Sequence, residues 1–547
     1  LFRSDPRVEA VQQVLSKQGG AGSPQWHLRA LDLAWLGWST PIDHAGLLAQ
    51  LAPALLDPVL HEPSLQPAPN GWLLSRRPLP AGSDPWADAL RQILALVAPS
   101  WPTPDLVVTG QGLVSNQPWR PELVRALTPG WCNPHVHATC VAQDPLEHAP
   151  PWPPTSVAPQ KTPQVPVRDV VSASDADLAA WSRQHHWGLS AAEWRAVQAW
   201  YAQAQRPASD VELGIIAQTW SEHCKHKVFS ARIEYQSLDP DDTATGIPRL
   251  VDSLFEQTVR ATVAAAPKPW LLSALVDNAG LVAFGDDDAL AVKVETHNAP
   301  SLLDPVAGAL TGVLGVQRDV LGCGLGAEPI ANLNVFCVAP AGTPNPWPER
   351  ILAPEQLLEG IRHGVEIAGN HSGVPTVNGS VCVDPGYLAR PLVLVGALGW
   401  TPRRPAGRPC ERKAVHPGDR IVLVGGRTGR DGLHGATLSS QAVGSATPGT
   451  MVQNGDPWLH KRLIDFLRGA RDLGLYRGLT DNGAGGLSSS VGELALLSGG
   501  AELDLTHMPV KAADLQAAEL LLSESQERMT LAVPPALWPA LRELARD

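Results

Sequence analysis

The segment VKVETHNAPS, at residues 292–301, holds the densest set of side chains suited to chemistry in this sequence. Lys293, Glu295 and His297 stand at alternate positions in it. Because alternate residues of an extended strand point to the same side, we expect these three side chains to share one face. Lysine suits a phosphate, a carboxylate suits Mg²⁺ and histidine suits proton transfer. The spacing favours a phosphate-handling edge, and the alternative is a solvated face of a half-buried strand.

A second polar cluster, TWSEHCKHK at residues 219–227, stands at the end of an expected apolar helix that begins at Asp210. A polar helix end is often only a solvated cap. This one directly follows an apolar helical face, so its side chains should lie at a domain edge. His223 is the member that could act as an acid or base near neutral pH.

A glycine-rich run, GALTGVLGVQRD, occupies residues 308–319. Glycines at helical spacing permit a close backbone approach, either to a ligand or to a neighbouring helix. The run ends with Arg318, which suits a phosphate, and Asp319, which suits a metal ion. We therefore treat this pair as candidate site residues.

Two further glycine-rich loops, at residues 425–437 and 480–490, match neither the phosphate-binding loop of P-loop enzymes nor the dinucleotide-binding fingerprint. The second loop, TDNGAGGLSSS, precedes an expected helix, so its backbone N–H groups could cradle an anion. Asp481 in that loop is a further candidate metal ligand. The segment SESQERM, at residues 523–529, offers short polar groups to a substrate.

The elements that must position these residues alternate between strands and helices. We expect strands in LAVKVETH, ANLNVFCVAP, RPLVLVGALGW and RIVLVGG, and helices in GALTGVLGVQRDVL, EQLLEGIRHGVEIAGN and SSSVGELALLSG. The segment LLSESQERMTLAVPP should change from helix to strand. This pattern predicts an α+β multidomain fold.

Upstream, the sequence predicts three different regions. Residues 1–142 suggest a tandem repeat of a small αβ unit, with helices expected at 45–63 and from 121. Proline density predicts a stiff linker at 143–173. A helical region follows at 174–227, with capping serines such as Ser174 and Ser190. Together with αβ domains at 228–403 and 404–547, this divides the chain into five parts.

Composition narrows the class of protein. The chain has 547 residues, 44% of them apolar and 18% charged, which excludes a wholly disordered chain and favours several domains. A net charge of −12 argues against a nucleic-acid coat or an anionic-membrane binder. No apolar run reaches the roughly 18 residues of a membrane span. Seven scattered Cys favour reduced thiols in a cytoplasmic protein, and a zinc site within residues 132–140 is disfavoured.

The motifs together resemble phosphoribosylformylglycinamidine synthase (FGAM synthase), in the order found in that family and over about residues 170–547. Those that carry the resemblance are TWSEHCKHKVF, VKVETHNAPS, TGVLGVQRDVLG, VGGRTGRDGLHGAT, TDNGAGGLSSSVGE and SESQERMTLAVP. Residues 1–142 resemble two divergent copies of the small accessory subunit of the same system. Related enzymes of the aminoimidazole ribonucleotide (AIR) synthetase superfamily lack the paired SEHC and ETHN motifs.

The resemblance implies a fold and a reaction. The fold would be an AIR synthetase-like N-terminal αβ domain followed by a C-terminal one, after small αβ repeats and a helical linker domain. The reaction would convert formylglycinamide ribonucleotide (FGAR), ATP and glutamine into FGAM, ADP, phosphate and glutamate in purine synthesis. The amide oxygen of FGAR is phosphorylated, and ammonia then displaces the phosphate. ATP and Mg²⁺ are the implied cofactors.

Family roles transfer to matching residues. The catalytic residues would be His223 and His297, and the ATP ligands Lys293 and His226. The Mg²⁺ ligands would be Glu295, Asp319 and Asp481. The FGAR-binding residues would be Thr296, Asn298, Arg318, Gln453, Glu524, Ser525 and Gln526. This sequence departs from many members at two positions, with Ala299 in place of a second His and His226 in place of a Tyr.

The resemblance also implies partners. The family's synthetase has two related halves, and this chain corresponds to the first, ending inside its second domain. We therefore interpret the sequence as a portion of a longer enzyme. No glutaminase nucleophile is evident, so ammonia would come from a separate glutaminase subunit or domain. Two alternatives are a non-catalytic binding or assembly half of an FGAM synthase complex and a different kinase-like member of the superfamily.

Overall fold

The computed structural model forms two compact units, residues 1–158 and 159–547. It describes residues 28–37, 43, 46, 72–78, 106–115, 121, 124, 137–142, 165–236, 250–344, 352–440, 451–511 and 515–546. Within these ranges, none of the helices combines the length and apolar character that crossing a bilayer requires.

The first unit contains a four-stranded antiparallel sheet. Its strands are β1 (Leu28–Gly37), β2 (Trp72–Pro78), β3 (Leu106–Ser115) and β4 (His137–Ala142), in the order β1-β3-β2-β4. The helices expected at 45–63 and from 121 lie almost wholly outside the described residues, as do Cys132 and His135. The tandem repeat stays a prediction.

The helical region begins the second unit. It comprises α5 (Asp175–His185), α6 (Ala191–Ala204), α7 (Asp210–Thr219) and the short α8 (Glu222–Lys225), with β5 (Val167–Arg168) paired to β6 (Ala208–Ser209). Ser174, Ser190 and Ser209 each cap a helix through a reciprocal capping box. Leu178, Trp194, Val197, Tyr201 and Leu213 form its core.

The expectation of one helix running from Asp210 into the polar cluster is wrong. The helix α7 ends at Thr219, and Ser221 then caps α8 by accepting a hydrogen bond from the Cys224 N–H. A serine side chain at this position competes for the backbone N–H groups and starts a new helix.

The N-terminal αβ domain is built on a six-stranded sheet in the order β13-β12-β14-β11-β10-β9. The strands are β9 (Leu271–Ser273), β10 (Gly280–Phe284), β11 (Asp288–Thr296), β12 (Glu328–Val338), β13 (Thr376–Val383) and β14 (Leu392–Pro402). Before the sheet come a short pair, β7 (Arg232–Glu234) and β8 (Leu250–Asp252), and α9 (Ala261–Ala265). The helices are α10 (Asn298–Leu303), α11 (Pro305–Gly322) and α12 (Pro354–Ser372).

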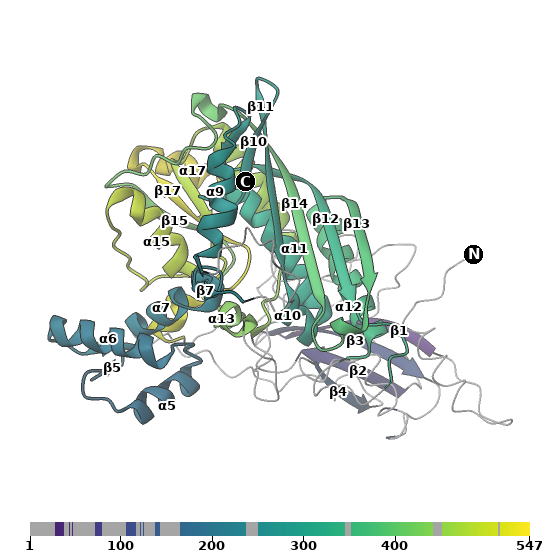
Figure 1. The fold of residues 1–547 in the computed structure, drawn as a ribbon. Helices are drawn as coiled ribbons and strands as arrows, with labels where there is room; N and C mark the ends of the chain where they lie inside the picture. Colours follow the sequence, from purple (N-terminus) through teal and green to yellow (C-terminus); the bar gives the residue numbers. More distant parts are fainter. Residues whose placement is uncertain are drawn as a thin grey trace, which may run out of the picture. The chain divides into compact units, whose positions relative to one another are not determined.

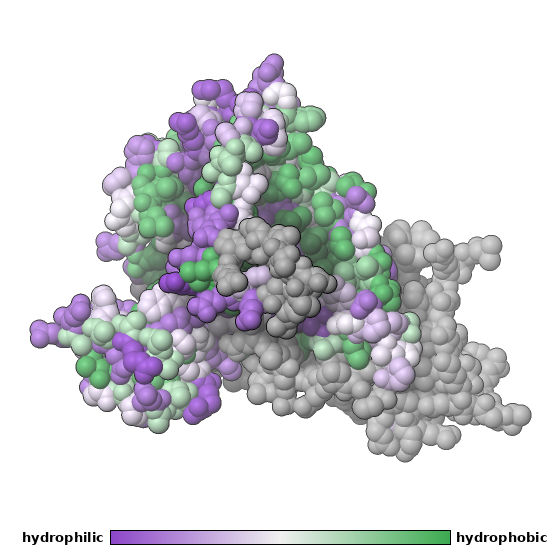
Figure 2. Space-filling model, viewed as in Figure 1, coloured by the Kyte–Doolittle hydropathy of each residue, from purple (hydrophilic) through white to green (hydrophobic). Residues whose placement is uncertain are grey.

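Helices α11 and α12 cover one face of this sheet, as Figure 1 shows. Val313 and Leu314 of α11 pack there against Val393, Val395 and other buried residues of β14. On the opposite face, as far as the described residues show, Val292 and Val294 of β11 remain 42% and 51% exposed. Figure 2 shows hydrophobic side chains gathered over these strands.

The C-terminal αβ domain has a three-stranded sheet, in the order β15-β17-β16. The strands are β15 (Arg420–Gly425), β16 (Gly478–Asp481) and β17 (Arg528–Val533), and the helices are α13 (Gly435–Ser439), α14 (Pro457–Asp472), α15 (Gly486–Ser498), α16 (Ala517–Leu522) and α17 (Trp538–Leu544). Leu463, Ile464 and Leu467 of α14 pack on Met529 and Leu531 of β17.

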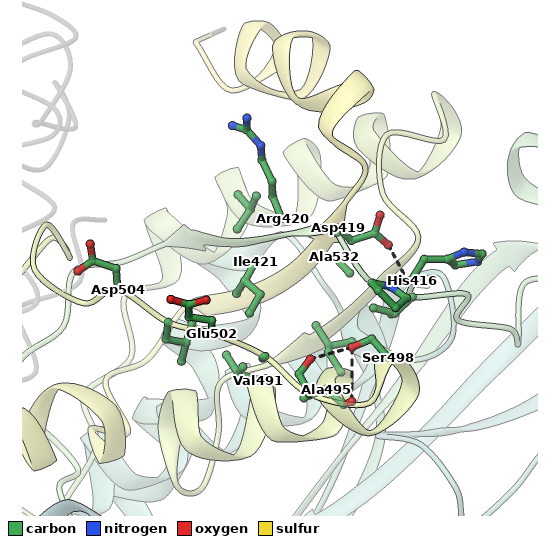
Figure 3. Close-up of a pocket in the computed structure, with 18 of the residues that line it drawn as sticks. His416, Asp419, Arg420, Ile421, Val491, Ala495, Ser498, Glu502, Asp504 and Ala532 are labelled. Atoms are coloured by element: carbon green, nitrogen blue, oxygen red, sulfur yellow. Dashed lines mark hydrogen bonds between the residues drawn. The ribbon is translucent and has the colours of Figure 1, made fainter.

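A hollow of about 780 Å³ lies beside β15 in this domain. Figure 3 shows Ile421 and Ala532 from the sheet, and Val491 and Ala495 from α15, around it. None of the candidate site residues lines this hollow.

The packing around two glycines predicts how replacing each by alanine changes the stability of the protein. A Cβ at Gly399 in β14 would lie 2.2 Å from the Val320 Cγ1 atom in the core, whereas one at Gly492 on α15 would meet nothing within 4 Å. We expect G399A to destabilise the protein by about 1–3 kcal/mol through overpacking. G492A should stabilise it by about 0.5–1 kcal/mol. Thermal unfolding of both variants checks this, and a G399A protein as stable as the unsubstituted one would contradict it.

Candidate active site

Strand β11 carries Lys293 and Glu295 on the face that continues toward α11. Lys293 follows the buried Ala289 and Ala291 at alternate positions, so its ammonium reaches the helix side of the sheet. The Lys293 Nζ atom lies 2.9 Å from Asp319 Oδ2 on α11 and 3.6 Å from Glu295 Oε2. The strand ends at Thr296 and His297 is the N-cap of α10, but His297 still lies against Gly312 of α11, so it stays on the helix side of the sheet with Lys293 and Glu295, as the alternation predicted.

Three carboxylates gather around this one lysine. Burial raises the pKa of Asp319, and the nearby Asp481 carboxylate raises it further. Burial also raises the pKa of Asp481, whereas Arg318 and Lys293 oppose that rise. Burial alone would lower the pKa of Lys293, but Asp319 and Glu295 more than offset it. With all groups ionised, Glu295, Asp319 and Asp481 leave an excess of negative charge that Lys293 does not balance.

The carboxylate oxygens are hard donors of the type that Mg²⁺ prefers. Among the described residues, however, no group of three His, Cys, Asp or Glu side chains already has metal-binding geometry. Asn278, which sequence reasoning missed, donates from Nδ2 to Asp481 Oδ1 at 3.0 Å and to the Thr480 hydroxyl oxygen. Its amide fixes one oxygen of Asp481 in place.

His297 lies against helix α11 at a glycine. A Cβ at Gly312 would come within 2.9 Å of the His297 Cβ, so only glycine lets the helix and the imidazole approach this closely. The His297 N–H donates to the Val393 carbonyl at 2.8 Å. Its Nδ1 atom is buried without a protein partner among the described residues. Burial lowers the pKa of His297, so the neutral imidazole is favoured.

His223, on α8, faces the same end of β11. Burial lowers the pKa of His223, and Glu295 is the neighbouring charge that opposes this shift most. His226 and Lys293 are close enough to lower the pKa further. His226 itself is exposed and has a left-handed backbone (φ 51°) that ends the helix.

Arg318 meets the SESQERM segment in the core between the two αβ domains. Its Nη1 atom lies 3.1 Å from Glu527 Oε1, and Nη2 donates to the Gln526 side-chain oxygen. Both members of the Arg318–Glu527 pair are buried. The Arg318 Nε–H has no protein partner among the described residues. Sequence reasoning selected Gln526 but missed Glu527, because a buried ion pair between distant segments leaves no local signal.

Glu524 collects donors from four separate segments. Its Oε2 accepts from Gln453 Nε2 at 2.8 Å and from the Ala436 N–H at 3.0 Å. Its Oε1 accepts from the Gly485 N–H at 3.3 Å and from Gln218 Nε2 at 3.5 Å. Burial raises the pKa of Glu524 to about 7. Sequence reasoning missed Gln218, which brings the linker helix α7 into this network and also accepts from the Thr437 hydroxyl at 2.8 Å.

The remaining sequence-predicted residues have different surroundings. The Ser525 hydroxyl accepts from the Gly429 N–H at 2.9 Å and donates to Asp431 Oδ1 at 2.7 Å, so it braces the glycine-rich loop. Asn298 Oδ1 accepts from the Val393 N–H at 2.8 Å. Thr296 is exposed at the end of β11.

The structure thus forms two adjoining groups from the predicted residues. One is a charged group of Lys293, Glu295, Asp319 and Asp481, with His223 beside it. The other is a polar group around Arg318, Gln453, Glu524, Gln526 and His297. Arg318 and Asp319 are consecutive on α11 and connect the two. Such an arrangement can hold a phosphate-bearing ligand against a basic residue and a neutral imidazole.

Three family models match this part of the chain. The Formylglycinamide ribonucleotide amidotransferase linker domain matches residues 178–227. The N-terminal domain of AIR synthase related protein matches 276–401, and its C-terminal domain matches 416–547. These matches, in this order, identify a PurL-like chain. The sequence-based prediction of an α+β multidomain fold with these two αβ domains is confirmed.

Curated relatives also indicate a PurL-like chain. The chain is 33% identical over 386 residues to phosphoribosylformylglycinamidine synthase subunit PurL of Thermoplasma volcanium, covering 70% of this chain and 46% of the relative. It is 41% identical over 274 residues to PurL of Methanopyrus kandleri, covering 49% of this chain and 36% of that one. The chain therefore spans about half the length, or less, of the curated relatives it matches.

A solved structure of Thermotoga maritima PurL complexed with FGAR is also similar. It is 31% identical, with a TM-score of 0.50, and the match covers 64% of this chain and 50% of that one. The chain therefore resembles this PurL both in sequence and in fold.

The environment of Glu524 predicts a pH effect on stability. Its folded-state pKa is raised from 4.5 to about 7, so the folded chain holds this proton more tightly than an unfolded chain does. The resulting stability is fully present below pH 4.5 and is lost as the pH rises to about 7. Glutamine cannot ionise, so E524Q does not lose this stability. The difference in melting temperature, E524Q minus the unsubstituted chain, should therefore increase as the pH rises from 4.5 to about 7.

The matched control is E543Q, because Glu543 is 70% exposed and pairs only with Arg546 at the surface. The melting temperature of E543Q should track that of the unsubstituted chain at every pH. A constant difference between E524Q and the unsubstituted chain would show that Glu524 has an ordinary pKa.

Proposed function

We propose that this chain is the first synthetase half of an FGAM synthase, which uses ATP to convert FGAR into FGAM in purine biosynthesis. The observation that carries the proposal is the charged group of Lys293, Glu295, Asp319 and Asp481 directly beside Arg318 and His297. The PurL-like motif order and the similarity to a PurL complexed with FGAR support it. A cytoplasmic location is part of the same proposal.

In the proposed mechanism, Lys293 neutralises charge on the transferred phosphate. Its ammonium is held by Asp319, so it pays little conformational entropy when it meets the phosphate. The carboxylates of Glu295, Asp319 and Asp481 would hold Mg²⁺, which neutralises phosphate charge when it is bound. The excess negative charge around Lys293 supports this assignment, because a divalent cation would balance it.

His297 is the proposed general base. A proton acceptor must be neutral beforehand, and burial favours the neutral form of this imidazole. Its buried Nδ1 atom has no hydrogen-bond partner among the residues that the structure describes, which supports a role toward a ligand. His223, across the end of β11, is the second proposed catalytic histidine. His226 is a proposed ATP contact from the end of α8.

FGAR would occupy the polar group. We propose Arg318, Gln453 and Gln526 as side-chain contacts; the buried Arg318 Nε has no hydrogen-bond partner within the described ranges, which supports this role for Arg318. We also propose Thr296, Asn298, Glu524 and Ser525 as members of the FGAR site. For Asn298, Glu524 and Ser525 the printed hydrogen bonds support a role in shaping the pocket through the backbone.

The proposed partners are the second synthetase half and a glutaminase subunit or domain that supplies ammonia. The face of the six-stranded sheet opposite α11 and α12 suits the second half, because Val292 and Val294 are exposed there and an apolar sheet face gains stability from being covered. The five-part division of the chain, including the accessory region at 1–142, remains part of this proposal.

One experiment tests the role of His297. In the completed enzyme, H297A should abolish FGAM formation from FGAR, ATP and ammonia, because the proposed base is removed. H507A is the matched control: His507 is an exposed histidine of the C-terminal domain, and its loss should leave the rate unchanged. Wild-type turnover by H297A would refute its assignment.

The same ammonia-driven assay on this chain alone separates two readings. One is catalysis by this chain, and the alternative is a half that binds or assembles without completing the reaction. Turnover by the isolated chain would exclude that alternative. If FGAR failed to stimulate ATP hydrolysis by the completed enzyme, a different kinase-like activity would be indicated.

The Mg²⁺ assignment makes a separate prediction. The affinity of the full chain for ATP should fall when a chelator removes Mg²⁺. In D481N the gain in ATP affinity that Mg²⁺ provides should be smaller, because one of the three carboxylates is lost. D465N is the control, since Asp465 pairs with Lys461 on the exposed side of α14. Calorimetric ATP titrations with and without Mg²⁺ measure both. An equal Mg²⁺ effect in D481N would contradict the assignment.

A further inference from the structure

Glu527 has an unusual backbone that its neighbours hold in place. Its φ angle is 51°, a left-handed conformation that non-glycine residues seldom adopt. The Glu527 carbonyl accepts from the Gly426 N–H at 2.9 Å. A Cβ at Gly425 would come within 2.0 Å of the same carbonyl oxygen, so β15 can approach only because that residue is glycine. This strained residue is therefore fixed by the C-terminal domain.

The two oxygens of the Glu527 carboxylate contact different elements. Oε1 lies 3.1 Å from Arg318 Nη1 on α11 of the N-terminal αβ domain. Oε2 accepts from the Asp456 N–H at 2.9 Å, at the residue that caps α14. Both oxygens are thus in use within the protein, and Glu527 is 1% exposed. Each oxygen of its carboxylate is therefore held by a protein donor.

The arrangement defines the orientation of Arg318. The two terminal nitrogens of the guanidinium are directed to Glu527 and Gln526, and the buried Nε–H has no hydrogen-bond partner in the part of the chain that the structure describes. An arginine that is already held by fixed acceptors loses less freedom when it binds a ligand. A buried guanidinium without a carboxylate partner would instead be costly and would move toward other acceptors.

We propose that Glu527 is a positioning residue that holds Arg318 in the orientation that binds FGAR. The inference rests on the proposed function. It assigns to Glu527 a role through Arg318 and no contact with the substrate.

A binding experiment on the full chain tests this. In E527Q the amide cannot serve both partners, because one of its ends is an N–H donor that would face either Arg318 or the Asp456 N–H. We expect FGAR affinity by calorimetry to fall by about tenfold to a hundredfold, as for a misplaced binding group. ATP affinity should stay unchanged, because Lys293 and the carboxylates around it do not touch Glu527.

A double-mutant cycle separates positioning from general stability. R318M should weaken FGAR binding, and adding E527Q to R318M should weaken it no further, since Glu527 acts only through Arg318. D419N is the matched control: Asp419 is a buried carboxylate paired to Arg477 at 3.0 Å in the same domain, beside the hollow of Figure 3. D419N should bind FGAR and ATP normally.

Normal FGAR binding by E527Q, or additive losses in the double variant, would overturn the proposal. So would a parallel loss of FGAR and ATP affinity together with a lower melting temperature, which would indicate a purely structural role. If the unsubstituted chain bound no FGAR, the proposed function itself would fail. If the unsubstituted chain binds FGAR and only the variants depart from the expected affinities, the role of Glu527 fails and the proposed function stands.

Discussion

The cost of burying charge where the two αβ domains meet constrains the rest of this structure. Arg318 and Glu527 are both almost inaccessible to solvent, so each needs the other. Because one residue belongs to α11 and the other precedes β17, their pairing joins the two domains. Asp319, the next residue of α11, is likewise paired with a cation, Lys293 of β11.

Glycines make this close arrangement sterically possible. Gly312 lets α11 approach His297, and Gly425 lets β15 approach the carbonyl of Glu527. A side chain at either position would push apart the elements that carry the charged groups. The glycine-rich run GALTGVLGVQRD therefore serves packing at Gly308 and Gly312, and the ligand-contact interpretation stays a prediction.

Several elements and residue groupings could be predicted from sequence, because their causes are local. Apolar periodicity located α11, α12, β11 and β14, and serine followed by an acidic residue located the starts of α5 and α6. The end of α7 was missed, since the Ser221 cap competes with continuation of the helix. Gln218, Asn278 and Glu527 were missed as well, because their importance comes from partners more than 200 residues away in the chain.

The sequence by itself determined which residue types are present for chemistry: a lysine and a carboxylate at alternate positions of one strand, and the motif order typical of FGAM synthase. Tertiary structure decided how they are used. It packed His297 against Gly312 of α11, enclosed Glu524 with donors from four segments and left the Nε–H of Arg318 without a hydrogen-bond partner among the described residues. The physical reason is that burial and pairing of charge depend on segments that meet only when the chain folds, whereas periodicity and capping are properties of neighbouring residues.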